Sequence, residues 1–298
     1  IGINLHHKKE EMESWIERST FRKNIEIFFE NSILGTGGAL KNAESFLKKD
    51  AFLVHNSDIL SDIDLRSIIN IHLSSGDIAT LAVCDHPEIN NVIISREGFV
   101  VGVGRIGSTM KRGVTFTGIA VYSPEFLRFL PEDKSSVVDG WLRAISSGKR
   151  IGTVDVSGSY WRDIGTPEAY FNAIVERLRM DGESIYIHPE TKVKEDLWPD
   201  GYVVIEKGCV INEGVSLRNC VMLPGSRAET KDNSPETPNN PPIPPLKSPP
   251  SPLFRNPPLP PFSKGGLGGL FENCIIGPGY SIRIDSSQSV KSLIGTGG

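Results

Sequence analysis

The first half of the chain alternates between continuous apolar runs and segments whose apolar residues recur at helical spacing. The predicted strands lie at residues 3–6, 26–30, 52–55, 78–83 and 116–122, and the predicted helices at 8–18, 39–49, 64–75 and 124–130. Two shorter strand-like stretches lie at 91–95 and 99–103. Strands that alternate with helices are typical of βαβ units, so the pattern predicts an α/β domain with a Rossmann-like, mostly parallel sheet.

The apolar run Phe52-Leu53-Val54 ends abruptly in the polar residues Asn56-Ser57-Asp58. A continuously apolar run is typical of a strand covered on both faces, and ligands of open α/β sheets bind outside the carboxyl ends of the strands. A helix cap is the structural alternative for each acidic residue here. We expect Asp64 to cap the next helix because it directly precedes that helix, whereas Ile59 and Leu60 separate Asp58 from it.

After residue 183 the apolar residues recur every six positions, at Ile205, Ile211, Leu217 and Leu223. Hexapeptide periodicity predicts a short β-helix, which we expect to be left-handed and to span 184–284. The sequence NCVMLPGS at 219–226 returns as NCIIGPGY at 273–280. Between the two copies, residues 230–269 hold most of the 21 prolines, which predicts a disordered insert. Residues 285–298 form a glycine-ended tail.

Composition narrows the class of protein. The 298 residues are 38% hydrophobic and carry 36 acidic and 32 basic side chains, with a net charge of −4. No basic stripe suited to nucleic acid and no apolar segment long enough for a membrane is evident. The four cysteines lack metal-ligand spacing, which favours buried thiols in a reducing compartment. We therefore expect a cytoplasmic protein with residues 1–183 as its first domain.

Two further motifs carry candidate chemistry. Gly35, Gly37 and Gly38 precede a predicted helix and match neither a Walker A loop nor a dinucleotide fingerprint, so a structural turn is the default interpretation. Backbone N–H groups at a helix start also suit anions and nucleotide edges. In the segment WRDIGTPEAY, Thr166 is a predicted N-cap with Pro167 at the first helical position, and Asp163 precedes it without capping the helix.

In order along the chain, the segments INLHH (3–7), LGTGGAL (34–40), HNSDIL (55–60), FTGIAVYSPEFLRFLP (116–131) and WRDIGTPEAY (161–170) resemble the sugar-1-phosphate nucleotidyltransferases, especially mannose-1-phosphate guanylyltransferase-like members. The resemblance covers residues 1 to about 180. It implies an enzyme that joins an NTP and a sugar 1-phosphate into an NDP-sugar and releases pyrophosphate. Many such enzymes carry a carboxyl-terminal β-helix, and those domains often mediate homo-oligomers.

The resemblance also implies roles for individual residues. Asp58 and Asp163 would hold Mg²⁺, a hard cation that prefers oxygen ligands. Gly35, Thr36, Gly37 and Gly38 would line the nucleotide. Asn91, Thr117 and Gly118 would border the sugar phosphate.

The chain departs from the family pattern in several places. The glycine-rich G-x-G-T-R signature, with the catalytic arginine and lysine, does not occur after Ile1, so we expect an upstream strand-loop-helix unit to be missing. The usual sugar-phosphate lysine is not evident either, and Arg105, Lys111 and Arg112 are nearby cations without an assigned role. Ser57 replaces the usual glycine before Asp58. These departures predict weak nucleotide binding and slow turnover.

Two other functions stay open. A noncatalytic or regulatory remnant that assembles through its β-helix is favoured by the missing segment. A hexapeptide acyltransferase is disfavoured because no histidine lies within residues 200–284 to serve as general base. Guanine and mannose rest on the resemblance alone, and thymidine or uridine donors with glucose or related sugars stay open.

Overall fold

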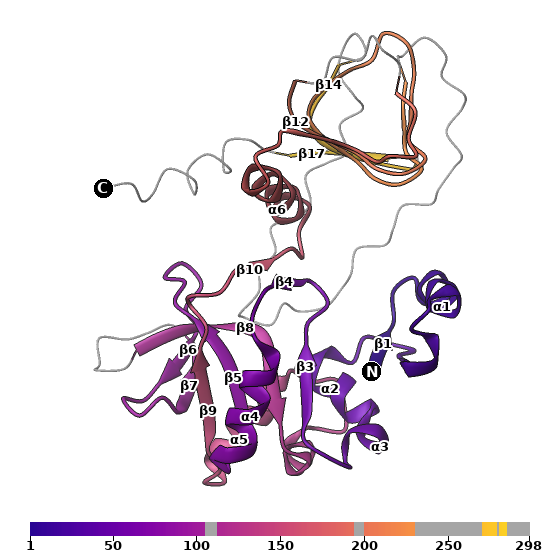
Figure 1. Cartoon of the computed structure of the whole chain (residues 1–298). Helices are drawn as coiled ribbons and strands as arrows, with labels where there is room; N and C mark the ends of the chain where they lie inside the picture. Colours follow the sequence, from indigo (N-terminus) through magenta and orange to yellow (C-terminus); the bar gives the residue numbers. More distant parts are fainter. Residues whose placement is uncertain (105–111, 194–199, 230–269, 279, 285–298) are drawn as a thin grey trace, which may run out of the picture. The chain divides into compact units, whose positions relative to one another are not determined.

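The computed structural model describes residues 1–104, 112–193, 200–229, 270–278 and 280–284 (Figure 1). The chain forms two compact units, Ile1–Trp161 and Arg162–Gly298. The predicted insert 230–269, the tail 285–298, and Arg105 and Lys111 lie outside the described residues.

The first unit is a mixture of strands and helices. In chain order its elements are β1 (Gly2–Leu5), α1 (Lys9–Arg18), η1 (Arg22–Asn24), β2 (Glu26–Phe29), α2 (Gly35–Asn42), α3 (Glu44–Leu47), β3 (Phe52–His55), β4 (Ile59–Ser61), α4 (Leu65–Ser75), β5 (Ala79–Cys84), β6 (Val92–Ile94), β7 (Val100–Val103), β8 (Arg112–Tyr122), η2 (Pro124–Phe129), α5 (Val137–Ser146) and β9 (Ile151–Asp155). Strand β10 (Trp161–Asp163) begins where this unit ends.

The main sheet has the strand order β7-β6-β8-β5-β9. Strand β3 pairs with the last four residues of β8, from Ile119 to Tyr122, whereas β6 pairs with the first three, from Arg112 to Val114. Strands β5 and β9 are parallel, whereas β8 runs antiparallel to β3, β5 and β6. The α/β class is confirmed, but the sheet is mixed and not mostly parallel. The reason is β8, which pairs antiparallel with all three of its neighbours, together with the antiparallel β6–β7 pair, whose strands are joined by a short turn.

Apolar side chains cover both faces of this sheet. Along β8, Ala120 and Tyr122 belong to one core, whereas Ile119 and Val121 belong to the other, as alternation along a strand requires. Helix α5 packs on the first core through Trp141, whose indole N–H donates to the Tyr122 hydroxyl at 3.2 Å. Helix α4 packs on the second core. The result is a layered α/β unit of the predicted kind.

Sequence prediction located most of these elements and missed η1, β4, α5, β9 and β10. The strand at 52–55 and the helix at 64–75 are confirmed within one residue. The segment predicted as a helix at 39–49 is split into α2 and α3, and that at 124–130 is the 3-10 helix η2. Helix α5 was not predicted, although Ser136 and Asp139 form a capping box at its start.

The second unit combines one helix with stacked strands. Its elements are α6 (Pro167–Met180), β11 (Ile185–Ile187), β12 (Asp200–Ile205), β13 (Val210–Ile211), β14 (Ser216–Met222), β15 (Arg227–Ala228), β16 (Leu270–Gly277) and β17 (Tyr280–Arg283). Strands β11, β12, β14 and β16 pair in parallel, and β17 adds an antiparallel edge. In Figure 1 the stacked chain follows a triangular outline.

Two buried clusters stabilise the second unit. One lies inside the stack and contains Ile205, Leu217 and Met222, with Ile211 packed against it. The other joins Phe171, Val175 and Leu178 of α6 to the outside of the stacked strands, and Leu223 packs there and not inside. Because α6 packs on these strands, the chain divides at Trp161, earlier than the predicted boundary at 183.

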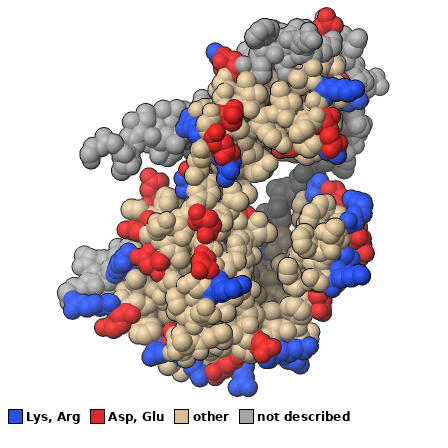
Figure 2. Space-filling model, in the orientation of Figure 1, with Lys and Arg blue, Asp and Glu red and all other residues tan. Residues whose placement is uncertain are grey.

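The two copies of the repeated sequence pair in register. Asn219 and Asn273 share a backbone φ of 48°, and Cys220 lies opposite Cys274. None of the helices in the described part of the chain is both long enough and apolar enough to cross a bilayer. On the face shown in Figure 2, acidic and basic side chains are mixed, with no broad patch of one sign.

Candidate functional site

Asp58 lies in a tight turn at the carboxyl end of β3. The Asn56 N–H donates to the Gly118 carbonyl at 3.0 Å, and the Ile59 N–H donates to the Asn56 carbonyl at 3.3 Å, which closes the turn before β4. The Asp58 side chain is exposed, and within the described residues no side chain or N–H group bonds to its carboxylate. A strand that ends in this turn presents a charged group to solvent instead of using it internally.

Gly118 lies directly against the Asp58 turn. Its φ is +81°, and a Cβ at this position would come within 2.9 Å of Ile59 Cγ1 and 3.1 Å of Asn56 Nδ2. A side chain would therefore push the turn away. The structure thus brings together two segments that the sequence suggested separately.

Thr117 is turned into the protein. Its side chain is fully buried, and its hydroxyl donates to the Ala82 carbonyl at 2.9 Å. Its own carbonyl accepts the Trp161 indole N–H at 2.9 Å. The hydroxyl is therefore committed to the sheet, and of the predicted sugar-site pair only Gly118, which is itself buried, lies directly against the Asp58 turn.

Asn91 is half-buried and precedes β6. Its backbone is paired, with its N–H on the Val114 carbonyl at 3.1 Å and its carbonyl accepting from Gly104 at 2.7 Å. The neighbouring amide Asn90 builds the loop, since it donates to Asp85 at 2.8 Å and accepts from Thr115 at 2.9 Å. The Asn91 side chain has no partner among the described residues, so its predicted role stays a prediction.

The glycine motif forms the first turn of α2 and packs against the segment before α5. The N–H groups of Gly37 and Gly38 donate to the Ser135 carbonyl at 2.9 and 3.4 Å. The Thr36 hydroxyl accepts the Val137 N–H at 2.9 Å. A Cβ on Gly37 would lie 2.8 Å from the Ser136 carbonyl oxygen. These contacts agree with the structural interpretation of the glycines, and two of the N–H groups predicted for a nucleotide are already used.

Two residues that the sequence analysis did not single out belong to this region. Glu30 is 4% exposed, and it accepts from the Asn4 amide and the Leu34 N–H, both at 3.0 Å, which anchors the turn before Gly35. His86 follows β5, stands edge-on to Trp161 at 6.4 Å between ring centroids, and has a buried Nδ1 without a partner. The polar pair Asp85-His86 directly after an apolar strand was the signal that could have identified His86.

The two predicted metal ligands belong to different units. Asp163, in the second unit, is exposed and accepts the Gly165 N–H at 2.9 Å. This bond uses one carboxylate oxygen and leaves the other. Within the described ranges, no group of three or more His, Cys, Asp or Glu side chains could hold a metal ion. The magnesium site of Asp58 and Asp163 stays a prediction.

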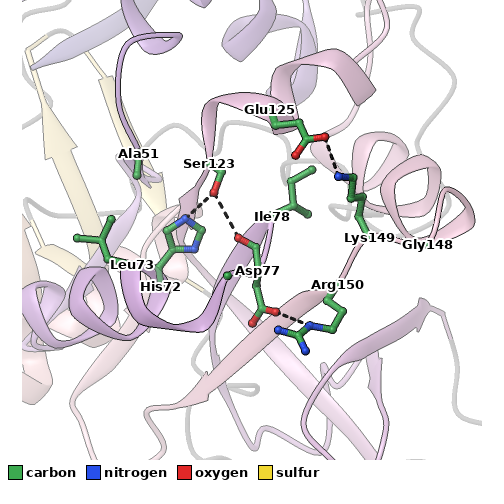
Figure 3. A pocket seen from close by; sticks show the side chains of 11 residues that line it. Ala51, His72, Leu73, Asp77, Ile78, Ser123, Glu125, Gly148, Lys149 and Arg150 are labelled. Atoms are coloured by element: carbon green, nitrogen blue, oxygen red, sulfur yellow. Dashed lines mark hydrogen bonds and ion pairs between the residues drawn. The ribbon is translucent and has the colours of Figure 1, made fainter.

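A cavity of about 460 Å³ opens at the other edge of the sheet, at the amino ends of β5 and β9 (Figure 3). Buried His72 contacts the Thr80 hydroxyl at 2.9 Å and the Ser123 hydroxyl at 3.1 Å. Buried Asp77 accepts from Arg150 at 2.8 Å. Burial lowers the pKa of His72, which favours the neutral ring. The polar groups here are bonded mainly to one another.

A second cavity, of about 410 Å³, lies at the carboxyl ends of β5 and β9 and is lined by Arg96, Arg112 and Asp155 among others. Asp155 accepts from the Ser157 hydroxyl and N–H, and these bonds hold the pKa of its carboxyl below the usual value. Arg112 reaches Asp155 at only 3.4 Å. Of the three cations Arg105, Lys111 and Arg112, only Arg112 belongs to the described residues, and it lies beside this cavity.

Relatives with similar sequences share one activity in their names. Mannose-1-phosphate guanyltransferase of Hypocrea jecorina is 25% identical over 258 residues, which cover 77% of this chain and 70% of the relative. Mannose-1-phosphate guanylyltransferase of Mycobacterium tuberculosis is 28% identical over 222 residues, covering 69% and 61%. No protein-family model matches the chain.

Solved structures share the fold. HddC from Yersinia pseudotuberculosis, complexed with GMP-PN, has a TM-score of 0.50 at 24% identity and covers 59% of this chain and 78% of its own. A UDP-glucose pyrophosphorylase complexed with UDP-glucose has a TM-score of 0.50 at 15% identity, covering 60% and 80%. At these identities the likeness concerns the fold alone.

Proposed function

The chain belongs to the sugar-1-phosphate nucleotidyltransferases, and on that premise we propose that it binds an NTP and a sugar 1-phosphate and forms an NDP-sugar with release of pyrophosphate. The observation that carries the proposal is the Asp58 turn, where a carboxylate without a partner among the described residues projects from the carboxyl end of β3 beside Gly118. Ligands of α/β sheets bind at this edge. GTP and mannose 1-phosphate are the substrates to test first, because the relatives are named for them.

Magnesium fits the donor set. Asp58 and Asp163 are exposed carboxylates, both oxygens of Asp58 are available, and the Gly165 N–H orients Asp163 through one oxygen. Carboxylate oxygens are the ligands that Mg²⁺ prefers, and the ion would offset the negative charge of the phosphates when bound. The residues of the chain then position the substrates: the turn beside Gly118 would admit the sugar, and Asn91 would offer it an amide.

The test of this function compares two aspartates that flank strand β3. Asp50 precedes β3 and Asp58 follows it, and both are exposed. We expect Mg²⁺ with GTP to raise the melting temperature of the wild type and of Asp50→Asn, and Asp58→Asn to lose this shift. Pyrophosphate release with mannose 1-phosphate measures turnover in the same three proteins. Equal shifts in both variants would refute the assignment of Asp58.

A double-mutant cycle tests whether Asp58 and Asp163 act on one ion. If they do, Asp58→Asn and Asp163→Asn each remove the Mg²⁺-dependent shift, and the double variant loses no more than either single one. Additive losses would show two independent sites and would remove the shared magnesium site from the proposal.

The second unit supports a further structural proposal. Its parallel strands β11, β12, β14 and β16, its two-stranded sheet β13–β15 and the six-residue spacing all favour a left-handed β-helix. Such a domain would assemble the chain into a homo-oligomer. Light scattering on the whole chain checks this, since a monomer at all concentrations would contradict it.

One observation favours the noncatalytic alternative. Gly37 and Gly38 already donate their N–H groups to Ser135, which leaves this turn fewer donors for a nucleotide. The alternative predicts assembly without any Mg²⁺-dependent response to GTP, UTP or dTTP. The thermal-shift series above therefore separates the two functions.

A further inference from the structure

Two cysteines of the second unit face each other across adjacent strands. In the parallel pair β14–β16, Cys220 lies directly opposite Cys274. The two sulfur atoms are 3.2 Å apart, and both residues are buried, with exposed fractions of 0% and 6%. The other two cysteines have no such neighbour: Cys209 donates to the Leu223 carbonyl at 3.2 Å, and Cys84 lies in the first unit.

The backbone holds this pair in place. Neighbouring strands are about 4.8 Å apart, and disulfides join Cα atoms about 4.4 to 6.8 Å apart, so in-register neighbours fall within the permitted range. Asn219 and Asn273, which precede the cysteines, share a φ of 48°, and the Asn219 amide donates to the Asn273 side chain at 3.0 Å. The two coils are therefore fixed in register at this position, and only side-chain rotation is needed to join the sulfurs.

We propose that Cys220 and Cys274 form a disulfide that joins two successive coils of the second unit when the chain is oxidised by hydrogen peroxide. Oxidation occurs in two balanced steps. The Cys220 thiolate attacks one peroxide oxygen, which leaves a sulfenic acid on Cys220 and releases hydroxide. The Cys274 sulfur then attacks the Cys220 sulfur and displaces the oxygen as water, so that two thiols and one peroxide yield one disulfide and two waters.

The hydrogen bond between the sulfurs assigns the two roles. Either sulfur can donate in this bond, and donation from Cys274 to Cys220 raises the pKa of Cys274, as burial also does. The same hydrogen bond stabilises a thiolate on Cys220 and lowers its pKa. The lowered pKa makes Cys220, although it is the less exposed of the two, the sulfur that ionises and attacks peroxide, and Cys274 then resolves the intermediate.

The disulfide would have a structural consequence. It would close the chain between 220 and 274, which in sequence includes the proline-rich segment 230–269. A closed loop restricts the unfolded chain and so stabilises the folded one. We expect the oxidised chain to melt at a higher temperature than the reduced chain.

The experiment treats the whole folded chain with hydrogen peroxide and then counts thiols after denaturation. We expect the four thiols of the reduced chain to fall to two. After tryptic digestion without reductant, peptide 219–227 should be linked to peptide 265–283, whereas 208–218, which holds Cys209, should stay unlinked. Four remaining thiols, or a link through Cys209 or Cys84, would overturn the proposal.

Cys→Ser variants at a control position and at the proposed positions separate the loss of the disulfide from a general effect of replacing a buried cysteine. Cys209→Ser should still form the link, and Cys220→Ser should not. In Cys274→Ser, dimedone should label the sulfenic acid on Cys220 and peroxide should leave the melting temperature unchanged. Labelling of Cys274 in the Cys220→Ser variant, at the level found for Cys220, would overturn the assigned order of steps.

Discussion

Asp77 at the amino edge and Asp58 at the carboxyl edge of the first unit's sheet are used in opposite ways, whereas Asp155, also at the carboxyl edge, is bonded to Ser157. At the amino edge, His72, Thr80 and Ser123 are bonded to one another, and Arg150 neutralises buried Asp77. At the carboxyl edge, Asp58 is exposed without a partner among the described residues. A polar group bonded inside the protein contributes to folding, whereas a group left open contributes little and can meet a ligand. The difference is consistent with the proposal that a ligand binds at Asp58, and it makes Asp77 a stabilising group.

The largest expected effect lies at the amino edge. Arg150→Ala leaves the Asp77 carboxylate, whose side chain is 6% exposed, without its cation, and also removes the bond to the Ser75 carbonyl. Because Arg150 itself is 57% exposed, we place the loss of unfolding free energy near the lower limit for buried pairs, at about 3 kcal/mol. Urea denaturation measures it. Lys149→Ala, which removes the exposed pair with Glu125, should cost about 0.5 kcal/mol, and an equal loss in both variants would contradict the comparison.

Gly37→Ala tests whether the glycine turn at the start of α2, which the sequence suggested for a nucleotide, stabilises the fold through its contacts with Ser135 and Ser136. A Cβ there would come within 2.8 Å of the Ser136 carbonyl oxygen, so we expect a loss of about 2 kcal/mol by urea denaturation. Gly158→Ala is the matched control, because nothing lies within 4 Å of its Cβ position. If the free energy of unfolding of Gly37→Ala equals that of the wild type, the turn does not stabilise the fold and is comparable to the exposed Asp58 turn.

The pH dependence of the free energy of unfolding tests the contribution of buried His72 at the amino edge. Burial holds the pKa of His72 below its ordinary value of 6.5, so the unfolded chain takes up the proton first. Stability from neutral His72 is therefore present above that value and falls as the pH drops below it. Unfolding free energies measured between pH 8 and pH 5 should fall more steeply for the wild type than for His72→Gln. Parallel curves would show that His72 does not titrate differently in the two states.

Asp58→Asn should have the smallest effect on folding. Its carboxylate is exposed and makes no bond within the described residues, so we expect a change below about 0.5 kcal/mol. The same variant should lose the Mg²⁺-dependent response. A large loss of stability would mean that Asp58 is a structural group, which would remove the contrast between the two edges.

Strands β3 and β5 show how far an apolar run alone can be interpreted. Both are mainly apolar, with Thr80 in β5 and His55 at the end of β3, and all six residues of β5 are buried between β8 and β9. Phe52, Leu53 and Val54 of β3 are only half-buried, because among the described residues β3 pairs with β8 alone. The sequence predicted both strands, but the number of neighbours on each strand was decided by pairing across the fold.

In the candidate site, too, some features could be predicted from the sequence and others depend on pairing across the fold. Asp58 could be predicted as an exposed group because the polar turn follows directly after an apolar strand. Thr117 could not be predicted as buried, since its hydroxyl bonds to Ala82, 35 positions away. Thr117 and Gly118 are both buried in β8, and pairing across the sheet, not the local sequence, decides this.

The sequence by itself determined the features that depend on near neighbours. Asp64 and Thr166 cap α4 and α6 as expected, because a cap bonds only to N–H groups two or three positions on. The repeated sequence also placed Cys220 and Cys274 at the same repeat position, whereas tertiary structure alone decided the position of Gly118 against the Asp58 turn and the bond from Val137 to Thr36, 101 positions apart. These contacts form only when strands and helices from distant parts of the chain meet, and no local pattern encodes which residues then touch.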